Sequence, residues 1–162
     1  MKWHVDEVIE RGWVRNAAGE QLPVIGSVSR EEAHVLGELI VENGFQRGIE
    51  TGIAHGISTL ALAEAFSETG GSMIGFDPCQ QTNHGDSALE TLNEYSLDSV
   101  FELRREPAQT GIAKLERESP VDFVFIDDVH NFQHRFVTFF LVDQLLRVGG
   151  VIAFHDLWLP SI

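Results

Sequence analysis

The sequence predicts an α/β fold in which helices cover both faces of a mainly parallel, five-stranded sheet. Two features predict it: short apolar runs bounded by turn-forming residues, and helical segments that alternate with those runs. Parallel strands need long crossover connections, and helices supply them on the two faces of the sheet. At 162 residues the chain has the length of about one domain and can bury a sizeable core.

Each element is expected from its own local signals. The expected strands are residues 46–50, 72–76, 99–104, 121–126 and 151–154. The expected helices are residues 5–13, 30–43, 56–67, 86–96, 108–118 and 132–148. Ser29 and Glu32 have the spacing of a capping box, and Gly149-Gly150 is expected to end the last helix. Residues 1–28 are predicted to form an arm that packs on a domain of residues 29–162.

Composition excludes several classes of function. Asp and Glu total 25 against 11 Lys and Arg, which gives a formal net charge of −14. Such a charge disfavours nucleic acid and anionic membranes as partners. Cys79 is the only cysteine, so an internal disulfide and a thiolate metal cluster are excluded. The amino terminus lacks an apolar signal core, and the sequence analysis predicts a cytoplasmic protein.

Residues 45–60 predict a strand, a turn with two glycines and the start of a helix. Gly52 and Gly56 have no Cβ, so a ligand can approach the backbone closely. A helix that begins near Gly56 directs unpaired N–H groups and the positive end of its dipole toward the turn, which suits an anion. Glu50 adds a negative charge and Ser58 a hydroxyl. An anion at the helix and a cation at Glu50 together suit an amino acid.

Polar residues follow the ends of the other predicted strands. The second strand ends at Asp77, the fourth at Asp127 and Asp128, and the fifth at His155 and Asp156. Ligands of open parallel sheets bind outside the carboxyl ends of the strands, so these side chains are expected along one edge. The Asp77 carboxylate can accept hydrogen bonds from both hydroxyls of a ribose. A turn or helix cap is the alternative explanation for each residue taken singly.

Four motifs in this order resemble the class I S-adenosylmethionine-dependent methyltransferases. They are residues 49–59, 76–78, 122–130 and 145–156. The resemblance covers residues 29–158 and is to the subfamily of cephalosporin hydroxylase-type and catechol O-methyltransferase-like enzymes. It implies a three-layer Rossmann-like methyltransferase sandwich with strand order 3-2-1-4-5, which lacks the last two strands of the full family fold.

The resemblance also implies a set of site residues. Those expected to bind S-adenosylmethionine are Glu50, Gly52, His55, Gly56, Ser58, Asp77, Ala108 and Asp127. Asp127 and Asp156 match positions that hold a divalent metal in catechol-type relatives, and Mg²⁺ suits two carboxylates with water. His130 matches the catalytic base, and Asp127 is expected to act with it. The expected reaction is methyl transfer to a hydroxyl of a small molecule, with or without Mg²⁺.

Three departures from the family pattern keep alternatives open. Leu157 stands where a third metal ligand is expected, so Asp128, His130 or His155 would have to replace it. Pro107 stands where an acid often contacts the adenine. Without further strands the fifth strand is an exposed edge, which predicts a homodimer through that edge. The alternative function is therefore a non-catalytic module that binds the cofactor or only retains the fold. A nicotinamide-dependent oxidoreductase ranks last, because the turn has two glycines where that fingerprint needs three.

Overall fold

The computed structural model describes residues 3–116, 119–129 and 131–157, and its centre is one parallel sheet. Its strands are β3 (Arg47–Thr51), β4 (Ser72–Phe76), β5 (Phe101–Arg104), β6 (Val121–Ile126) and β7 (Leu146–Phe154). They lie in the order β5-β4-β3-β6-β7, and every pairing is parallel. Counted from β3, this is the predicted order 3-2-1-4-5. The predicted fold class is therefore confirmed.

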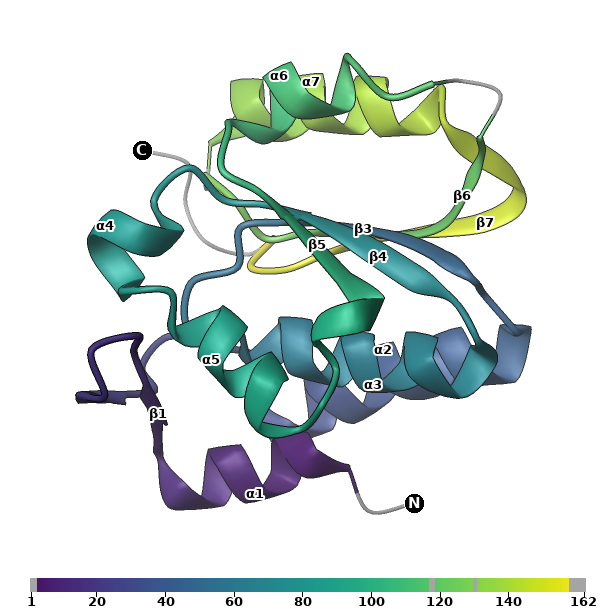
Figure 1. Cartoon of the computed structure of the whole chain (residues 1–162). Helices are drawn as coiled ribbons and strands as arrows, with labels where there is room; N and C mark the ends of the chain where they lie inside the picture. The colour runs from purple at the N-terminus through teal and green to yellow at the C-terminus, as the bar shows by residue number, and fades with distance from the viewer. Residues whose placement is uncertain (1–2, 117–118, 130, 158–162) are drawn as a thin grey trace.

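Helices cover both faces of the sheet (Figure 1). On one face lie α2 (Arg30–Asn43), α3 (Ile57–Thr69) and α5 (Ser87–Glu94), with α1 (His4–Arg11) packed outside α2 and α3. On the other face lie α6 (Ala108–Ile112) and α7 (Phe132–Asp143). The remaining elements are the hairpin β1 (Trp13–Arg15) and β2 (Gln21–Pro23), α4 (Gln80–His84) and the 3₁₀ turn η1 (Asp98–Val100). None of the helices in these residues is both long and apolar enough to cross a membrane.

The core has two layers because alternate residues of each strand point to opposite faces. Phe123 and Phe125 of β6 pack in the layer under α2 and α3, while Val124 and Ile126 pack in the layer under α6 and α7. All four side chains are buried. This explains why the strand reads as a near-continuous apolar run in the sequence.

The capping box at the start of α2 is present as predicted. The Ser29 hydroxyl accepts the backbone N–H of Glu32, and the Glu32 carboxylate accepts the backbone N–H of Ser29. Gly44 ends the helix in the left-handed conformation. The first turn of α2 is thereby fixed beside the carboxyl edge of the sheet, where Glu32 lies 3.6 Å from His155.

The prediction for the last helix was wrong at its carboxyl end. The helix was expected to run to residue 148 and end at Gly149-Gly150, but α7 ends at Asp143 and both glycines lie within β7. The register explains the difference: Val121 pairs with Leu146 and Phe123 with Val151, so β7 has extra residues between the two pairs. Gly149, at φ +84°, permits this irregularity. Apolar periodicity alone does not separate a helix from the start of a buried strand.

The helix expected at 108–118 is also shorter in the structure, since α6 ends at Ile112. Gly111 packs directly against the Phe76 ring, where an added Cβ would lie 2.1 Å from a ring carbon. This short helix leaves the amino-terminal half of that sheet face uncovered, over β3, β4 and β5.

Candidate active site

The site begins at the turn between β3 and α3, and both of its glycines are required by packing. Gly52 has φ +78°, and a Cβ there would lie 2.4 Å from the carbonyl oxygen of Asp127. Gly56 has φ +82°, and a Cβ there would lie 2.6 Å from the Ala88 Cβ. The left-handed backbone and these close approaches both favour glycine. The turn therefore packs directly against Asp127, the residue that follows β6.

Glu50 lies beneath this turn as a fully buried carboxyl group. The Ser58 hydroxyl donates a hydrogen bond to Glu50 Oε1 at 2.5 Å, while Glu50 Oε2 is buried without a hydrogen-bond partner. Burial raises the pKa of Glu50 to about 8, and the nearby Asp127 and Asp77 carboxylates add to the rise. In the ligand-free protein the group is therefore mostly protonated at neutral pH. A cation placed beside it would favour its ionised form.

Asp77 holds the same turn from the end of β4. Its carboxylate accepts backbone N–H groups from Ile53 at 3.3 Å, Ala54 at 3.1 Å and Cys79 at 2.8 Å. The side chain is 6% exposed. Asp77, the residue predicted to contact a ribose, therefore also holds the backbone of the turn between β3 and α3.

Gln80, which the sequence analysis did not single out, completes this arrangement. Its side-chain amide donates to the carbonyl of Ala54 at 2.8 Å and to Asp77 Oδ2 at 3.3 Å. Ala54 has φ +47°, a left-handed conformation that costs a residue with a Cβ roughly 1–2 kcal/mol. Asp77 and Gln80 therefore hold the Ala54 N–H and carbonyl in place. The only sequence signal for Gln80 was a glutamine three residues after Asp77 in a polar stretch.

A cavity of about 350 Å³ opens at the carboxyl edge between β3, β4 and α6. Its lining includes Gly52, Asp77, Pro107, Ala108, Gln109 and Asp128. The Gln109 amide donates to Asp128 Oδ2 at 3.2 Å and to the Thr138 hydroxyl at 2.6 Å. Asp128 Oδ1 is buried and has no hydrogen-bond partner. Burial raises the pKa of Asp128, which the Gln109 hydrogen bond partly offsets.

Beside this cavity, Asp127, His155 and Asp156 form a compact cluster. His155 Nδ1 lies 3.2 Å from a carboxylate oxygen of Asp127 and 3.3 Å from one of Asp156. One donor atom from each of the three residues lies within 4.8 Å of the others. The His155 ring packs edge-on to Phe125, at 6.1 Å between ring centroids. Two carboxylates and an imidazole at this spacing are a possible ligand set for a divalent cation.

The structure brings most of the predicted site residues to one edge, in three groups. Gly52, Asp77 and Ala108 line the cavity. Glu50 and Ser58 bond to each other beneath the turn. Asp127 and Asp156 belong to the cluster that includes His155, and Gly56 lies in the turn itself, against Ala88.

Two predicted residues are not brought into these groups. His55 packs edge-on against His84, at 4.9 Å between ring centroids, and burial lowers its pKa, with a smaller contribution from His84. His130, the predicted base, lies outside the described residues. Of the three possible substitutes for the metal ligand at Leu157, His155 lies in the cluster and Asp128 bonds instead to Gln109. Leu157 itself is exposed.

The sheet order and the crevice at the carboxyl edge define the class, a Rossmann-like fold with its ligand crevice at the strand ends. The chain belongs to the family described as methyltransferase domain, whose model matches residues 49–157. Tricin synthase 1 of Oryza sativa subsp. japonica is 32% identical over 146 residues, which cover 83% of this chain and 54% of the relative. The resemblance to class I methyltransferases is thereby confirmed.

Solved structures agree with this assignment. An O-methyltransferase from Bacillus cereus, solved in complex with S-adenosylhomocysteine, is 28% identical with a TM-score of 0.72, and the match covers 91% of this chain and 63% of that one. The O-methyltransferase TomG from Streptomyces achromogenes, solved with S-adenosylmethionine, is 23% identical with a TM-score of 0.69, over 79% of this chain and 56% of that one. The second match shows the fold alone. The chain spans about half the length of the curated relative it matches.

Proposed function

We propose that this chain is the cofactor-binding core of an S-adenosylmethionine-dependent O-methyltransferase that acts on small molecules. The observation that carries the proposal is the crevice at the carboxyl edge, where the glycine turn and Asp77 meet the Asp127–His155–Asp156 cluster. Membership in the methyltransferase-domain family supports it. A relative solved in complex with S-adenosylhomocysteine supports the choice of cofactor.

The methionine part of the cofactor would lie along the turn from Gly52 to Gly56, with His55 and Ser58 beside it. Its ammonium group would take the ionised Glu50 carboxylate as its partner, because Glu50 Oε2 is otherwise a buried acceptor without a donor. The ribose hydroxyls would donate to Asp77 Oδ1, which accepts only the Cys79 N–H among the described residues.

The adenine would occupy the cavity beside Ala108. Pro107 lines this cavity where relatives often carry an acid. The Asp128 Oδ1 atom, which has no donor, is the acceptor on the opposite wall that suits the adenine amino group. Gln109 would hold the Asp128 side chain in place through its hydrogen bond to the other oxygen.

The Asp127–His155–Asp156 cluster would hold a divalent cation. Two carboxylates fit Mg²⁺, while an imidazole nitrogen fits Mn²⁺ or Zn²⁺ better, so the donor set suits a divalent metal with His155 as third ligand. When bound, such a cation lowers the pKa of a substrate hydroxyl and orients it. His130 stays the predicted base, since an imidazole accepts a proton near neutral pH. A cytoplasmic location also stays a prediction.

The alternative is a non-catalytic module that binds the same cofactor. The replacement of the adenine-contacting acid by Pro107 and of a metal ligand by Leu157 favours this alternative. The two functions differ in one product, because only an enzyme forms S-adenosylhomocysteine from S-adenosylmethionine.

The experiment is a product assay with a panel of aromatic hydroxyl compounds, with Mg²⁺, with Mn²⁺ and with a chelator. We expect S-adenosylhomocysteine to form with at least one acceptor, and Asp156→Asn to reduce the rate only where metal is present. Cofactor binding without product over the whole panel would assign the non-catalytic module. Asp77→Ala and Glu50→Ala are both expected to weaken cofactor binding, and unchanged binding in both would contradict the site assignment.

A further inference from the structure

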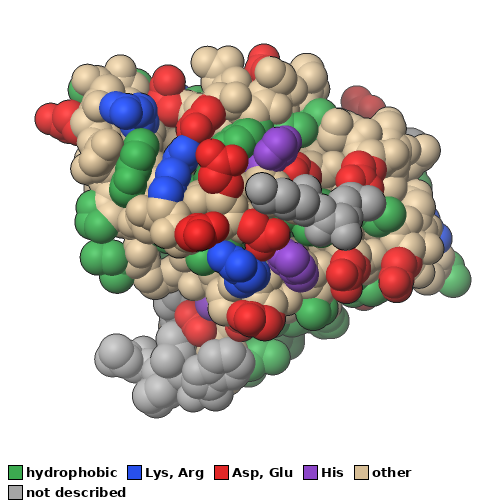
Figure 2. Space-filling model, turned by 90° about the horizontal axis from the view of Figure 1, so that it is seen from below, with side chains coloured by type: hydrophobic (Ala, Val, Ile, Leu, Met, Phe, Trp, Pro, Cys, Tyr) green, Lys and Arg blue, Asp and Glu red, His purple; other side chains and the backbone are tan. Residues whose placement is uncertain are grey.

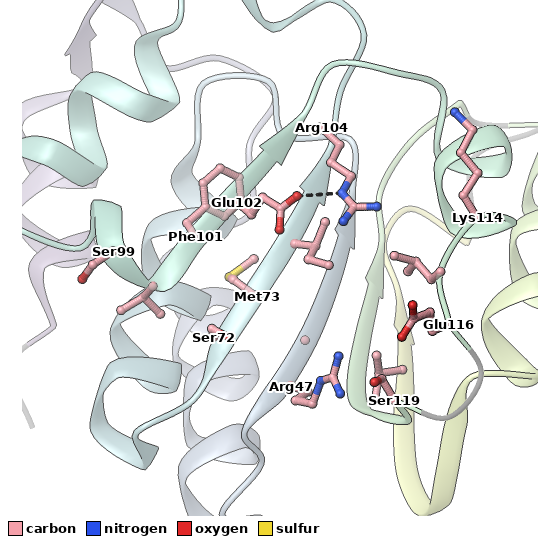
Figure 3. A pocket seen from close by; sticks show the side chains of 15 residues that line it. Arg47, Ser72, Met73, Ser99, Phe101, Glu102, Arg104, Lys114, Glu116 and Ser119 are labelled. Atoms are coloured by element: carbon pink, nitrogen blue, oxygen red, sulfur yellow. Dashed lines mark hydrogen bonds and ion pairs between the residues drawn. The ribbon is translucent and has the colours of Figure 1, made fainter.

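A second and larger cavity, of about 570 Å³, lies at the amino-terminal half of the sheet. It opens on the face that the short α6 leaves uncovered, between β3, β4 and β5 on one side and residues 114–116, 119 and 121 on the other (Figure 3). The glycine turn and Asp77 lie at the opposite, carboxyl ends of the same strands. This cavity is therefore separate from the proposed cofactor site. Its volume is within the range of small-molecule sites.

Successive side chains of a β-strand point to opposite faces of the sheet, and this alternation decides which residues line the cavity. The face of the sheet on which α6 packs carries lining residues from all three strands. They are Arg47 of β3, Ser72 and Ile74 of β4, and Glu102 and Arg104 of β5. Ile74 packs in the apolar layer under α6 and α7, so the floor is partly apolar. Lys114 stands on the opposite wall, and in Figure 3 the Arg47 and Arg104 side chains border the hollow while the Lys114 ammonium group points away from it.

The lining of this hollow does not share the acidic excess of the molecule. Among the described lining residues, three cations, Arg47, Arg104 and Lys114, stand against two acids, Glu102 and Glu116, on a chain whose formal net charge is −14. Figure 2, viewed from the side of α1, shows by contrast a face on which acidic side chains predominate and cations are few. An anionic ligand is therefore repelled less in this hollow than over the acidic parts of the surface.

Arg47 is the cation that is free to bind. Arg104 already pairs with Glu102 at 2.8 Å, and Lys114 pairs with Glu106 at 2.5 Å. The Arg47 guanidinium makes no hydrogen bond or ion pair within the part of the chain that the structure describes, although the Arg47 backbone N–H donates to Asp122. A guanidinium binds phosphate or carboxylate through two parallel hydrogen bonds. Ser72 and Ser99 add hydroxyl groups to the same lining.

We propose that this cavity binds a small organic anion, with its phosphate or carboxylate group on Arg47 and an apolar part over Ile74. The site is independent of the methyl-transfer proposal, because it uses none of the residues of the carboxyl edge. It therefore stands or falls separately from the proposed function.

The test is a chemical-shift titration of ¹⁵N-labelled protein with phenyl phosphate, inorganic phosphate and citrate. We expect saturable shifts in the backbone amides of Arg47, Ser72 and Ser99, with phenyl phosphate the tightest of the three. Saturation by inorganic phosphate or by citrate at these amides would assign the anionic group that Arg47 prefers. Shifts that do not saturate, or that spread over all cationic regions alike, would overturn the proposal.

Matched variants sharpen this test. Arg47→Gln should weaken phenyl phosphate binding by about tenfold or more, since it removes a charge-assisted pair. Arg15→Gln, an exposed arginine on the β1–β2 hairpin, should leave binding unchanged. The ¹⁵N spectrum of Arg47→Gln should match that of the parent protein away from this cavity, which shows that the variant is folded. Equal phenyl phosphate affinity in Arg47→Gln and the parent would contradict the proposed site.

Discussion

At the residue scale, the candidate site depends on buried polar groups whose partners are incomplete. Glu50 Oε2 and Asp128 Oδ1 are both buried acceptors without a donor. Leaving such an atom unsatisfied costs on the order of 1–3 kcal/mol, and more for a charged group. A site that lowers its own stability in this way is expected where a ligand supplies the missing donor.

Glu50 predicts a pH dependence of stability. Its pKa is about 8 in the folded protein, against 4.5 ordinarily, so between these values the folded state holds a proton that the unfolded state has released. The free energy of unfolding therefore falls as the pH rises from about 4.5 to about 8. Glu50→Gln removes this titration, so between pH 5 and pH 8 it should lose less stability than the parent protein does, by roughly 3–4 kcal/mol.

Urea denaturation of the two proteins at pH 5 and pH 8 measures this difference. Glu38→Gln is the control, because Glu38 is an exposed residue of α2. If the parent protein and Glu50→Gln lost the same stability over this range, Glu50 would not be protonated in the folded state.

Gln80 and Ala54 form a pair that predicts coupled effects. Gln80→Ala removes the donor to the Ala54 carbonyl, and should weaken S-adenosylmethionine binding by roughly tenfold because the strained turn is released. Ala54→Gly removes the cost of the left-handed backbone conformation. Because Gln80→Ala releases this strain in the parent but has none to release when residue 54 is glycine, Gln80→Ala should lose more folding stability in the Ala54→Gly background than in the parent. A double-mutant cycle of unfolding free energies measures the coupling, and strict additivity would contradict it.

At the element scale, the sequence predicted the order of the strands and helices because the local signals agreed. The capping box of Ser29 and Glu32 fixed the start of α2, and the near-continuous apolar run of β6 predicted a strand buried on both faces. The bounds of α7 and β7 could not be predicted, since Leu145 and Leu146 fit a helix stripe and a strand equally well. The extra residues in β7 depend on its pairing with β6, which no local window contains.

The candidate site, like the fold, was predictable where local signals sufficed and not where contacts join distant segments. Residues at strand ends, such as Asp77 and Asp156, follow from the fold, because parallel strands end at one edge. The contacts of Gln80 and Gln109 join segments distant in the sequence, and no pattern in the chain signals them. His155 was visible at the end of a strand, but its place between two carboxylates follows only from the structure.

Replacing a positive-φ glycine by alanine should cost more stability where the added Cβ also meets another atom. Gly52→Ala combines a left-handed φ with a Cβ 2.4 Å from the Asp127 carbonyl oxygen, so it should destabilise the protein by about 2–4 kcal/mol. Gly26→Ala is the matched control, because Gly26 has φ +69° but no atom within 4 Å of its Cβ position. It should cost about 1–2 kcal/mol. Urea denaturation of both variants gives the comparison, and equal losses would show that the contact with Asp127 does not matter.

At the scale of the whole molecule, β7 and α7 present an unusual surface. β7 is an outer strand of the sheet, and Phe132, Phe136 and Phe140 of α7 are each more than half exposed. An outer strand beside exposed aromatic rings favours association, even on a molecule as acidic as this one. The predicted homodimer through the β7 edge stays a prediction.

Sedimentation equilibrium at high micromolar concentration tests it. We expect a dimer for the parent protein and a monomer for Phe136→Asp, which places a charge on the aromatic surface. Ile25→Asp is the control, because Ile25 is an exposed apolar residue in the connection between β2 and α2. A monomeric parent protein, or a dimer that Phe136→Asp leaves intact, would contradict this interface.

The central claim is that the carboxyl-edge crevice binds S-adenosylmethionine, and calorimetric titration of the cofactor tests it most directly. The titration is run with and without Mg²⁺, at pH 6 and at pH 8. We expect saturable binding with one site per chain, tighter at pH 8 because the cofactor's ammonium group needs the ionised Glu50. Tighter binding with Mg²⁺ would support the Asp127 and Asp156 metal site. The absence of binding at millimolar cofactor, with the protein folded, would contradict the account.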